Sequence, residues 1–257
     1  MDAPVLCAVA GGVATLTLNR PDKRNALNTA LLAGLDRHVA ELEARDDVRV
    51  IVVRGAGPAF CAGMDLDELL ARHAAAADPE ADVTAVLARI ERARHPTLAV
   101  VHGDAFAGGC ELALHCDLRI AAETARLAMP LARLGIVVPW VLGRKLVEVV
   151  GAAHAREILL VGRPLDAARA LAIGLVHRVV PAAGIEAATA ELAATLAGNA
   201  PLAVRAMKAT VLRAAADRDG IAHDDLDELA RRARASADAE EGIRAMLAKR
   251  RPSFRGE

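Results

Sequence analysis

The sequence is poor in aromatic and serine side chains. It contains no tyrosine, and aromatic residues make up only 2% of its 257 residues. Aromatic platforms on which nucleic-acid bases could stack are therefore absent, and the core must be built from Ala, Val, Leu and Ile. The only serines are Ser236 and Ser253, in the last quarter of the chain. No Gly-x-Ser-x-Gly elbow exists, which argues against a serine hydrolase.

The chain also lacks a strong net charge, paired cysteines and long apolar runs. Its formal net charge is −1, so nothing draws it as a whole to nucleic acid or to anionic membranes. No apolar run approaches the 18 residues of a membrane span, and no basic stretch precedes an apolar one at the N-terminus. We therefore expect a cytoplasmic protein. The four cysteines are scattered and include no Cys-x-x-Cys pair, which fits a reducing compartment. They are Cys7, Cys61, Cys110 and Cys116.

Two glycine-rich turns are the most informative feature that is present. They are Phe60-Cys-Ala-Gly-Met-Asp-Leu66 and Val101-His-Gly-Asp-Ala-Phe-Ala-Gly-Gly-Cys-Glu-Leu112. Each follows a β-rich run and leads into a helical pattern, so each delivers backbone N–H groups to the carboxyl end of a strand. Two such turns can hold one carbonyl oxygen while a thioester becomes an enolate. The alternative is that glycine only relieves steric crowding in ordinary strand-to-helix turns.

Hydrophobic periodicity predicts an α/β fold with a helical tail. Apolar runs predict strands over residues 5–9, 13–18, 48–53, 97–101, 118–121 and 175–180. Spacing of three and four predicts helices over residues 29–44, 83–93 and 110–116, then over 185–197, 201–216 and 224–248. The alternation indicates a parallel sheet with its ligands at the carboxyl ends of the strands. The Ala-rich stretch 73–77 is interpreted as a frayed helix end or a mobile loop above the site.

Several segments, taken together, resemble the enoyl-CoA hydratase/isomerase (crotonase) family. The resemblance implies a spiral of β-β-α units over residues 1–190, which holds an acyl-CoA site, and an all-helical oligomerisation region over 191–257. It also implies a homotrimer or a dimer of trimers, a role in fatty acid metabolism, and no cofactor beyond the coenzyme A of the substrate. The segments are Leu18-Asn-Arg-Pro-Asp-Lys-Arg-Asn-Ala-Leu-Asn28, the turn at 60–66, residues 103–112, Cys116-Asp-Leu-Arg-Ile120, residues 170–176 and Lys249-Arg-Arg-Pro-Ser-Phe254.

The resemblance also assigns site residues. The oxyanion donors would be the N–H groups of Met64 and Gly108, and Glu111 matches one of the two glutamates with which hydratases of this family activate water. Coenzyme A would meet Arg24, from the basic cluster Arg20, Lys23 and Arg24, although such clusters are more often solvated loops. We expect Asp65 to cap the following helix. The remaining predicted contacts are the backbone at Ala26, Ala62, Gly63, Asp65 and Leu66, an acyl pocket with Leu131 and Trp140, and Lys249 near a neighbouring subunit's site. The alternative for Trp140 is a core aromatic at a helix start.

The chain departs from the family pattern at the second glutamate, where Leu131 follows Met129-Pro130. A positioned proton-transfer group contributes about 10²–10⁴ in rate, so hydration with two glutamates cannot be assumed. The alternatives are a double-bond isomerase with one base, or a non-catalytic acyl-CoA binding protein. His115-Cys116-Asp117 lacks the spacing of a common zinc site, so we expect no metal. Substitutes for the missing carboxylate, all near the two turns in sequence, are Asp104, Asp67, Glu68 and His102.

Overall fold

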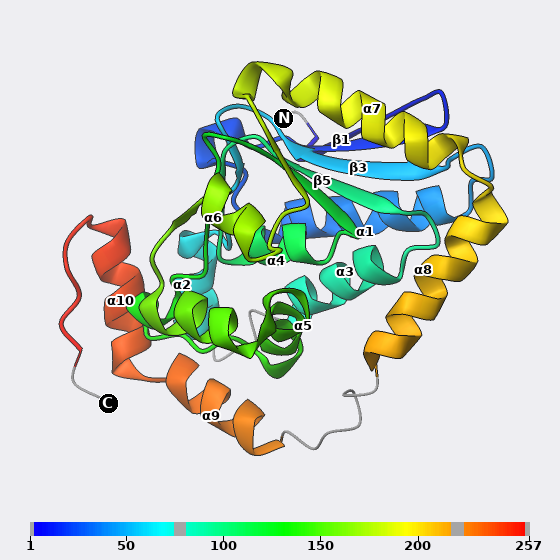
Figure 1. Ribbon diagram of the computed structural model, residues 1–257. Helices are drawn as coiled ribbons and strands as arrows, with labels where there is room; N and C mark the ends of the chain where they lie inside the picture. Colours follow the sequence, from blue (N-terminus) through cyan, green and yellow to red (C-terminus); the bar gives the residue numbers. More distant parts are fainter. Residues whose placement is uncertain (1–2, 75–80, 217–223, 255–257) are drawn as a thin grey trace.

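The computed structural model describes residues 3–74, 81–216 and 224–254, and its centre is a six-stranded sheet (Figure 1). The strand order is β1-β2-β3-β5-β7-β10, with an antiparallel β1–β2 hairpin and parallel pairing elsewhere. Gly11 and Gly12 both have positive φ, as a two-residue hairpin turn requires. The strands are β1 (Val5–Ala10), β2 (Val13–Leu18), β3 (Val50–Gly55), β5 (Thr97–Val101), β7 (Leu118–Ala122) and β10 (Arg178–Val180).

All six predicted strands are present, but the last is shorter than predicted. β10 begins at Arg178, because Leu175 and Val176 lie in a turn after a short helix, where the N–H of each donates to Ala170 O. Leu175 and Val176 are each 1% exposed. Their apolar character thus reflects burial in a turn rather than a strand. The predicted loop stretch 73–77 lies mostly outside the described residues.

A second, smaller sheet was not predicted. Its order is β4-β6-β8-β9, with β4, β6 and β8 parallel and β9 antiparallel. The chain alternates between the sheets: β3 is followed by β4, β5 by β6 and β7 by β8, and helical segments follow each pair. This arrangement is the predicted spiral of β-β-α units. The strands of the small sheet are β4 (Ala59–Cys61), β6 (Asp104–Phe106), β8 (Arg126–Ala128) and β9 (Leu165–Asp166).

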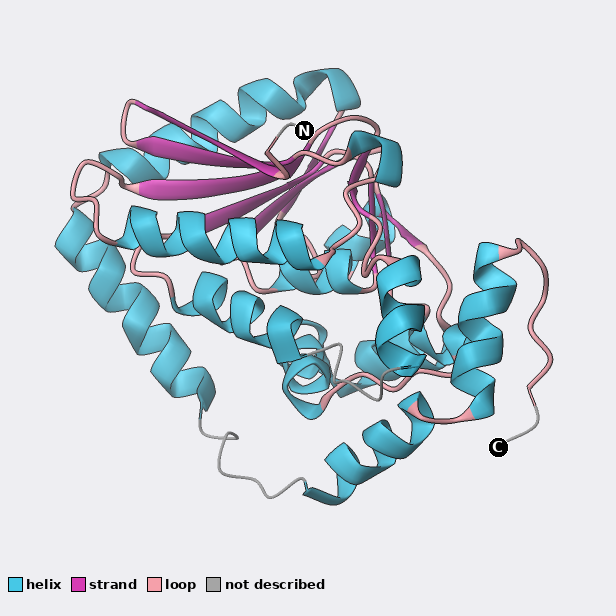
Figure 2. Ribbon diagram, turned by 180° about the vertical axis from the view of Figure 1, so that it is seen from behind, coloured by secondary structure: helices cyan, strands magenta, loops and turns pink. Residues whose placement is uncertain are grey.

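Helices cover both faces of the large sheet, as Figures 1 and 2 show. Alternate residues of β3 point to opposite faces. Ile51 and Val53 join a core with α1, α3 and α4, whereas Val50 and Val52 pack against α7. The helices are α1 (Thr29–Glu43), α2 (Leu66–Ala74), α3 (Ala81–Arg92), α4 (Gly108–Leu114), α5 (Trp140–Arg156), α6 (Ala167–Ala172), α7 (Ile185–Gly198), α8 (Pro201–Ala215), α9 (Asp224–Arg234) and α10 (Ala237–Leu247).

The C-terminal region contains more helices than predicted. The single helix predicted over 224–248 is wrong, because Ser236 caps a new helix by accepting a hydrogen bond from Ala239 N. α10 folds back against α2 and the 3₁₀ helix η2 (Leu131–Leu134). α7 spans residue 190 and packs on the large sheet, so the helices that leave the sheet begin at α8 (Figure 1). Within the described ranges, no helix has the length and apolar character needed to cross a bilayer.

Candidate active site

Three parallel strands of the small sheet end side by side, and the predicted site residues follow them directly. β4 ends at Cys61, β6 at Phe106 and β8 at Ala128. The N–H of Ala107 donates to Ala128 O over 2.8 Å, which ties the second turn to the third strand end. Carboxyl ends of parallel strands are where α/β folds bind ligands. The structure thus brings together the two glycine-rich turns and the segment that carries Leu131.

The first turn leaves the N–H of Met64 directed into this site. Residues 27 and 64 form a parallel bridge, in which Leu27 N donates to Gly63 O over 2.7 Å and Asp65 N donates to Leu27 O over 2.9 Å. In a parallel pairing of this kind the residues on either side of Met64 make the bonds. The N–H of Met64 itself therefore points away from Leu27.

The second turn presents the N–H of Gly108 beside Met64. Gly108 is the first residue of α4, where an N–H has no partner within its helix. A Cβ atom built on Gly108 would lie 3.7 Å from Met64 N, and one built on Gly63 would lie 3.4 Å from Gly108 N. The two amides therefore border the same small space, which only glycine at these positions keeps open. Ala107, just before them, has a φ of 46°, which fixes the turn in an uncommon conformation.

Glu111 lies one helical turn after Gly108 and is 1% exposed. His115, four residues later on α4, is also buried, and its Nδ1 donates to the backbone oxygen of Glu111 over 2.8 Å. The same Nδ1 lies 4.0 Å from Glu111 Oε2. Burial lowers the pKa of His115, so the ring is neutral near neutral pH. A buried carboxyl group one helical turn after an amide donor suits proton transfer at a carbon beside a carbonyl.

The three cations predicted near the coenzyme differ in their surroundings. Arg20 is used internally, because its guanidinium donates to Asp65 Oδ2 over 2.9 Å and to Ala26 O over 2.6 Å. Lys23 lies 3.4 Å from the Asp67 carboxylate. Arg24 is exposed and takes part in none of the ion pairs of the described residues. Of the three, Arg24 is thus the one without a carboxylate partner among the described residues.

The backbone around Arg24 lies directly against the first turn. Ala62 N donates to Arg24 O over 3.0 Å. Together with the 27–64 bridge, this bond places the predicted coenzyme contacts on one surface. Asp65 caps α2 as predicted: its Oδ1 accepts from Asp67 N over 3.2 Å, and its side chain is buried.

Asn25 holds this loop in place, a role that the sequence analysis missed. It is fully buried, with a φ of 57°, and its Nδ2 donates to Ala56 O and Ala59 O over 2.8 Å each and to Phe60 O over 3.2 Å. Its Oδ1 accepts from Arg20 N over 2.9 Å. One side chain thereby ties the loop to the strand that enters the first turn. The sequence offered one signal for this role: an asparagine, which tolerates positive φ, closely follows a Pro-Asp turn.

The substitutes considered for the missing carboxylate all have contacts elsewhere. These contacts hold them by bonds to neighbouring loops, helices and strands rather than directing them to the two amides. They are Asp104 with Arg126 at 2.7 Å, Asp67 with Lys23 at 3.4 Å, Glu68 with Thr29 N at 2.9 Å, and His102 Nε2 with Gly57 O at 2.9 Å.

Three further predicted residues lie in separate elements of the chain. Leu131 begins η2, is half-buried, and packs against both the main core and the small apolar cluster beneath α10. Trp140 is the half-buried first residue of α5, so it is not a fully buried core aromatic. Lys249 is exposed just beyond α10. Their roles toward a ligand stay predictions.

The His115-Cys116-Asp117 sequence has separate hydrogen-bond partners. Cys116 Sγ lies 3.5 Å from Leu112 O, and Asp117 accepts from the backbone and hydroxyl of Thr97 and from Lys208. Within residues 3–74, 81–216 and 224–254, no three His, Cys, Asp or Glu side chains are grouped to hold a metal ion.

Curated relatives match nearly the whole chain. It is 36% identical over 244 residues to a probable enoyl-CoA hydratase of Mycobacterium tuberculosis, with 94% of each chain covered. It is also 36% identical over 247 residues to the 2,3-dehydroadipyl-CoA hydratase of Escherichia coli, with 95% of each covered.

Solved structures match it equally completely. A methylmalonyl-CoA decarboxylase in complex with 2-nitronate-propionyl-CoA superposes with a TM-score of 0.91 at 28% identity, with 98% of each chain covered. An enoyl-CoA hydratase from Mycobacterium avium subsp. paratuberculosis gives a TM-score of 0.85 at 27% identity, with 98% of this chain and 99% of that chain covered. The model of the enoyl-CoA hydratase/isomerase family matches residues 8–257, and the chain belongs to that family.

Proposed function

We propose that this protein hydrates a 2-enoyl-CoA thioester at the site between the two glycine-rich turns. One observation carries the proposal: the N–H groups of Met64 and Gly108 border one small space, and Glu111 lies one helical turn further on. Two amide donors suit the negative charge that a thioester oxygen acquires as an enolate forms. The names of the relatives agree with a hydratase.

With Leu131 in place of a second glutamate, one carboxyl group must serve both halves of the hydration. Glu111 takes a proton from water as the water oxygen bonds to C3, and the C2=C3 electron pair moves into the enolate held by the two amides. The protonated Glu111 then gives its proton to C2. One water molecule is consumed, and the carboxylate is restored.

Contacts to coenzyme A are part of the proposal. Arg24 faces solvent and binds a phosphate group. The backbone at Ala26 and from Ala62 to Leu66 meets the rest of the coenzyme, which enters as part of the substrate, and no further cofactor is used. Leu131 and Trp140 line the acyl pocket. Both side chains are half-buried, Leu131 at the start of η2 and Trp140 at the start of α5, which supports this assignment.

A second candidate reaction is decarboxylation of a 2-carboxyacyl-CoA. Loss of CO₂ generates the enolate directly, so it needs the amide pair and one acid to protonate C2 but no second carboxylate. Leu131 favours this reaction, as does the TM-score of 0.91 to a methylmalonyl-CoA decarboxylase. Double-bond isomerisation also needs one base, which moves a proton between C2 and C4. Binding without catalysis remains the alternative that Leu131 supports and Glu111 opposes.

The proposal includes a homotrimer or a dimer of trimers in the cytoplasm, with a role in fatty acid metabolism. α8 has no buried residue, and it exposes Leu202, Met207 and Val211 to 78%, 67% and 67%. Three large apolar side chains this exposed on one helix are typical of a surface that contacts another subunit. Lys249, exposed beyond α10, would then reach a neighbouring coenzyme.

A substrate panel tests the proposal. The protein is incubated with 2-enoyl-, 3-enoyl-, 3-hydroxyacyl- and methylmalonyl-CoA, and the products are identified by chromatography and mass spectrometry. Interconversion of 2-enoyl- and 3-hydroxyacyl-CoA supports hydration, whereas propionyl-CoA from methylmalonyl-CoA supports decarboxylation instead. If no thioester is turned over but acetoacetyl-CoA binds, the protein is a binding protein and the catalytic proposal is wrong.

A further inference from the structure

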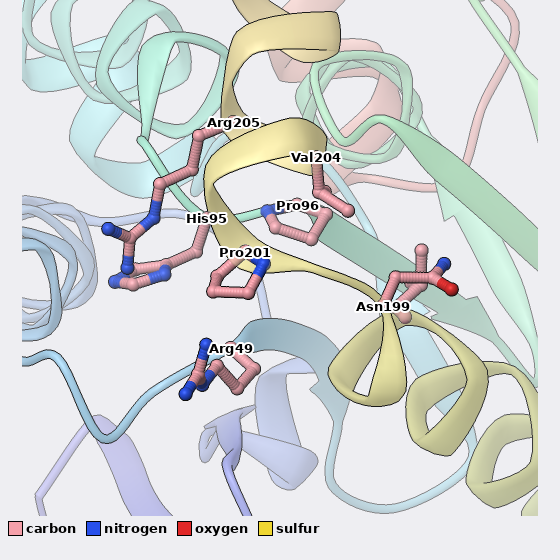
Figure 3. A pocket seen from close by; sticks show the side chains of 8 residues that line it. Arg49, His95, Pro96, Asn199, Pro201, Val204 and Arg205 are labelled. Carbon is pink, nitrogen blue, oxygen red and sulfur yellow. The ribbon is translucent and has the colours of Figure 1, made fainter.

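A small basic pocket lies at the amino ends of β3 and β5, away from the thioester site at the carboxyl ends of the small sheet (Figure 3). Arg49 enters it from just before β3, and His95 from just before β5. The side chain of Arg205 extends from α8 into the pocket and lies beside the ring of His95. None of the eight described residues that line the pocket is acidic.

The two arginines of this pocket have no carboxylate to neutralise them. Neither Arg49 nor Arg205 forms an ion pair with any described residue, although most arginines of the described part of the chain that are half-buried do. A guanidinium group offers several N–H donors in a fixed plane that matches oxyanions. Two of them facing one pocket without a counter-charge are typical of an anion site.

His95 supplies a second, independent observation. It is 1% exposed, and its Nε2 lies 3.1 Å from Leu42 O and 3.3 Å from Arg94 Nε. Its Nδ1 is enclosed and has no hydrogen-bond partner among the described residues. Buried polar atoms in proteins are almost always hydrogen-bonded, so this atom indicates a missing partner.

The beginning of α8 contributes to the same pocket. Pro201 is its first residue, the preceding Ala200 provides no side-chain cap, and Pro201 and Val204 line the pocket. Pro201 has no N–H, and Val204 N donates to Ala200 O over 3.0 Å, so this part of α8 forms a wall of the pocket and adds no free amide donor. The pocket leaves about 10 Å³ for the centre of a water-sized atom, which is room for about one oxygen atom.

We propose that this pocket binds an oxyanion of the phosphate or sulfate type, with one oxygen between Arg49, Arg205 and His95. This binding site is separate from the thioester site and does not depend on the proposed activity. The bound oxygen accepts hydrogen bonds from both guanidinium groups and from Nδ1 of a protonated His95, whose Nε2–H donates to Leu42 O.

The protonation of His95 couples to binding. In the anion-free protein, burial and the cations Arg94, Arg205 and Lys208 lower its pKa, against a hydrogen bond to Leu42 that raises it. Arg49 also faces the pocket. Lys208 is paired with Asp117, and Arg94 is paired with Asp46 but keeps its Nε 3.3 Å from His95 Nε2. A bound dianion stabilises the imidazolium and raises the pKa, so the affinity increases as pH falls and decreases as pH rises through the pKa of the complex.

Calorimetric titration with sodium sulfate tests the site, because sulfate keeps both charges over the whole range in which a histidine titrates. We expect one saturable site per chain with a Kd of about 1 mM or below. Arg49→Gln and Arg205→Gln each weaken binding about 10-fold or more. Arg213→Gln, on the same helix but outside the pocket, is the matched control and leaves the Kd unchanged. His95→Asn removes the pH dependence of the Kd.

Two further arms identify the source of the anion. The titration is repeated with inorganic phosphate, and then with sulfate after saturation with acetoacetyl-CoA. An unchanged sulfate Kd assigns the site to a free anion, whereas competition assigns it to a phosphate group of the coenzyme. The proposal is overturned if sulfate does not bind saturably, or if Arg205→Gln and Arg213→Gln weaken it equally, which would indicate an adventitious ion only.

Discussion

At the scale of single residues, the site has one carboxyl group, that of Glu111, and an apolar side chain, that of Leu131, where the family pattern has a second glutamate. Glu111 is buried one turn into α4, whereas Leu131 contributes an apolar side chain at the start of η2, three residues after β8 ends. The sequence predicted both the glutamate at 111 and its missing partner at 131, because each position lies in a segment that matches the family pattern. It did not predict that Arg20 would be bonded to Asp65 and Ala26, since a basic cluster does not reveal which cation has an internal partner.

The first prediction concerns the carboxyl group of Glu111. Glu111→Gln should lower kcat by about 10²–10⁴, because the amide keeps the shape but cannot transfer a proton. Affinity for acetoacetyl-CoA should stay within a few-fold of wild type. Steady-state kinetics on the substrate found in the panel, with calorimetry, measure both quantities.

Asp104→Asn is the matched control for Glu111→Gln, because Asp104 is paired with Arg126 near the same turn. It should retain nearly full turnover. Full activity in Glu111→Gln, with loss in Asp104→Asn, would show that the base has been assigned to the wrong residue.

The second prediction concerns Leu131. Leu131→Glu should raise the rate of crotonyl-CoA hydration, since a second carboxyl group can then protonate C2. It should also lower the free energy of unfolding by about 1–3 kcal/mol, because Leu131 packs against two apolar clusters. Kinetics and urea denaturation measure the two effects. Leu131→Gln, which cannot transfer a proton, should show the stability loss alone; an equal gain in rate would refute the acid role.

At the scale of elements, the position of the site follows from three very short strands. β4, β6 and β8 have three residues each, too few for alternation to be recognised in a sequence, so the small sheet was missed. The turns that follow these strands were predicted, because glycine is needed where another backbone approaches. A Cβ on Gly109, for example, would lie 2.2 Å from Cys61 O. Turn chemistry thus revealed the site better than strand periodicity.

The third prediction tests the space between the two amides. Gly108→Ala should lower kcat/KM about 10-fold or more, because the new methyl group would lie 3.7 Å from Met64 N, where the thioester oxygen is expected. The helix should tolerate alanine, since Leu27 Cδ1, at 3.1 Å, is the end of a flexible side chain. Thermal unfolding is measured beside the kinetics.

Gly198→Ala serves as the control for Gly108→Ala, because a Cβ at Gly198 meets nothing within 4 Å. Both variants should unfold within a few degrees of wild type. If Gly108→Ala were as active as Gly198→Ala, the two amides would not bind the reacting carbonyl.

At the scale of the whole molecule, the family resemblance predicted the spiral of β-β-α units. Hydrophobic periodicity did not predict where the C-terminal helices begin and end. Residues 224–248 have continuous helical periodicity, yet the chain turns at Ser236 so that α10 packs on α2 and η2. The Ser236 cap and the packing of Ile243 and Ala239 in one apolar cluster with Leu134 explain this turn. α8, by contrast, has no buried residue within the chain.

The fourth prediction concerns assembly through α8. Light scattering at micromolar concentration should give the mass of three or six chains. Met207→Asp, at a side chain 67% exposed in the isolated chain, should shift the mass toward one chain, because a charge would be buried at the interface. A wild-type monomer would rule out this assembly.

The central claim is that the amides of Met64 and Gly108 bind a thioester oxygen. The most direct measurement is calorimetric titration of the wild-type protein with acetoacetyl-CoA, with its free acid, and with a thioether analogue that lacks the carbonyl oxygen. We expect the thioester to bind, the free acid not to bind, and the thioether to bind about 10-fold more weakly, since two hydrogen bonds are lost. Equal affinity for thioester and thioether, or for thioester and free acid, would contradict the account.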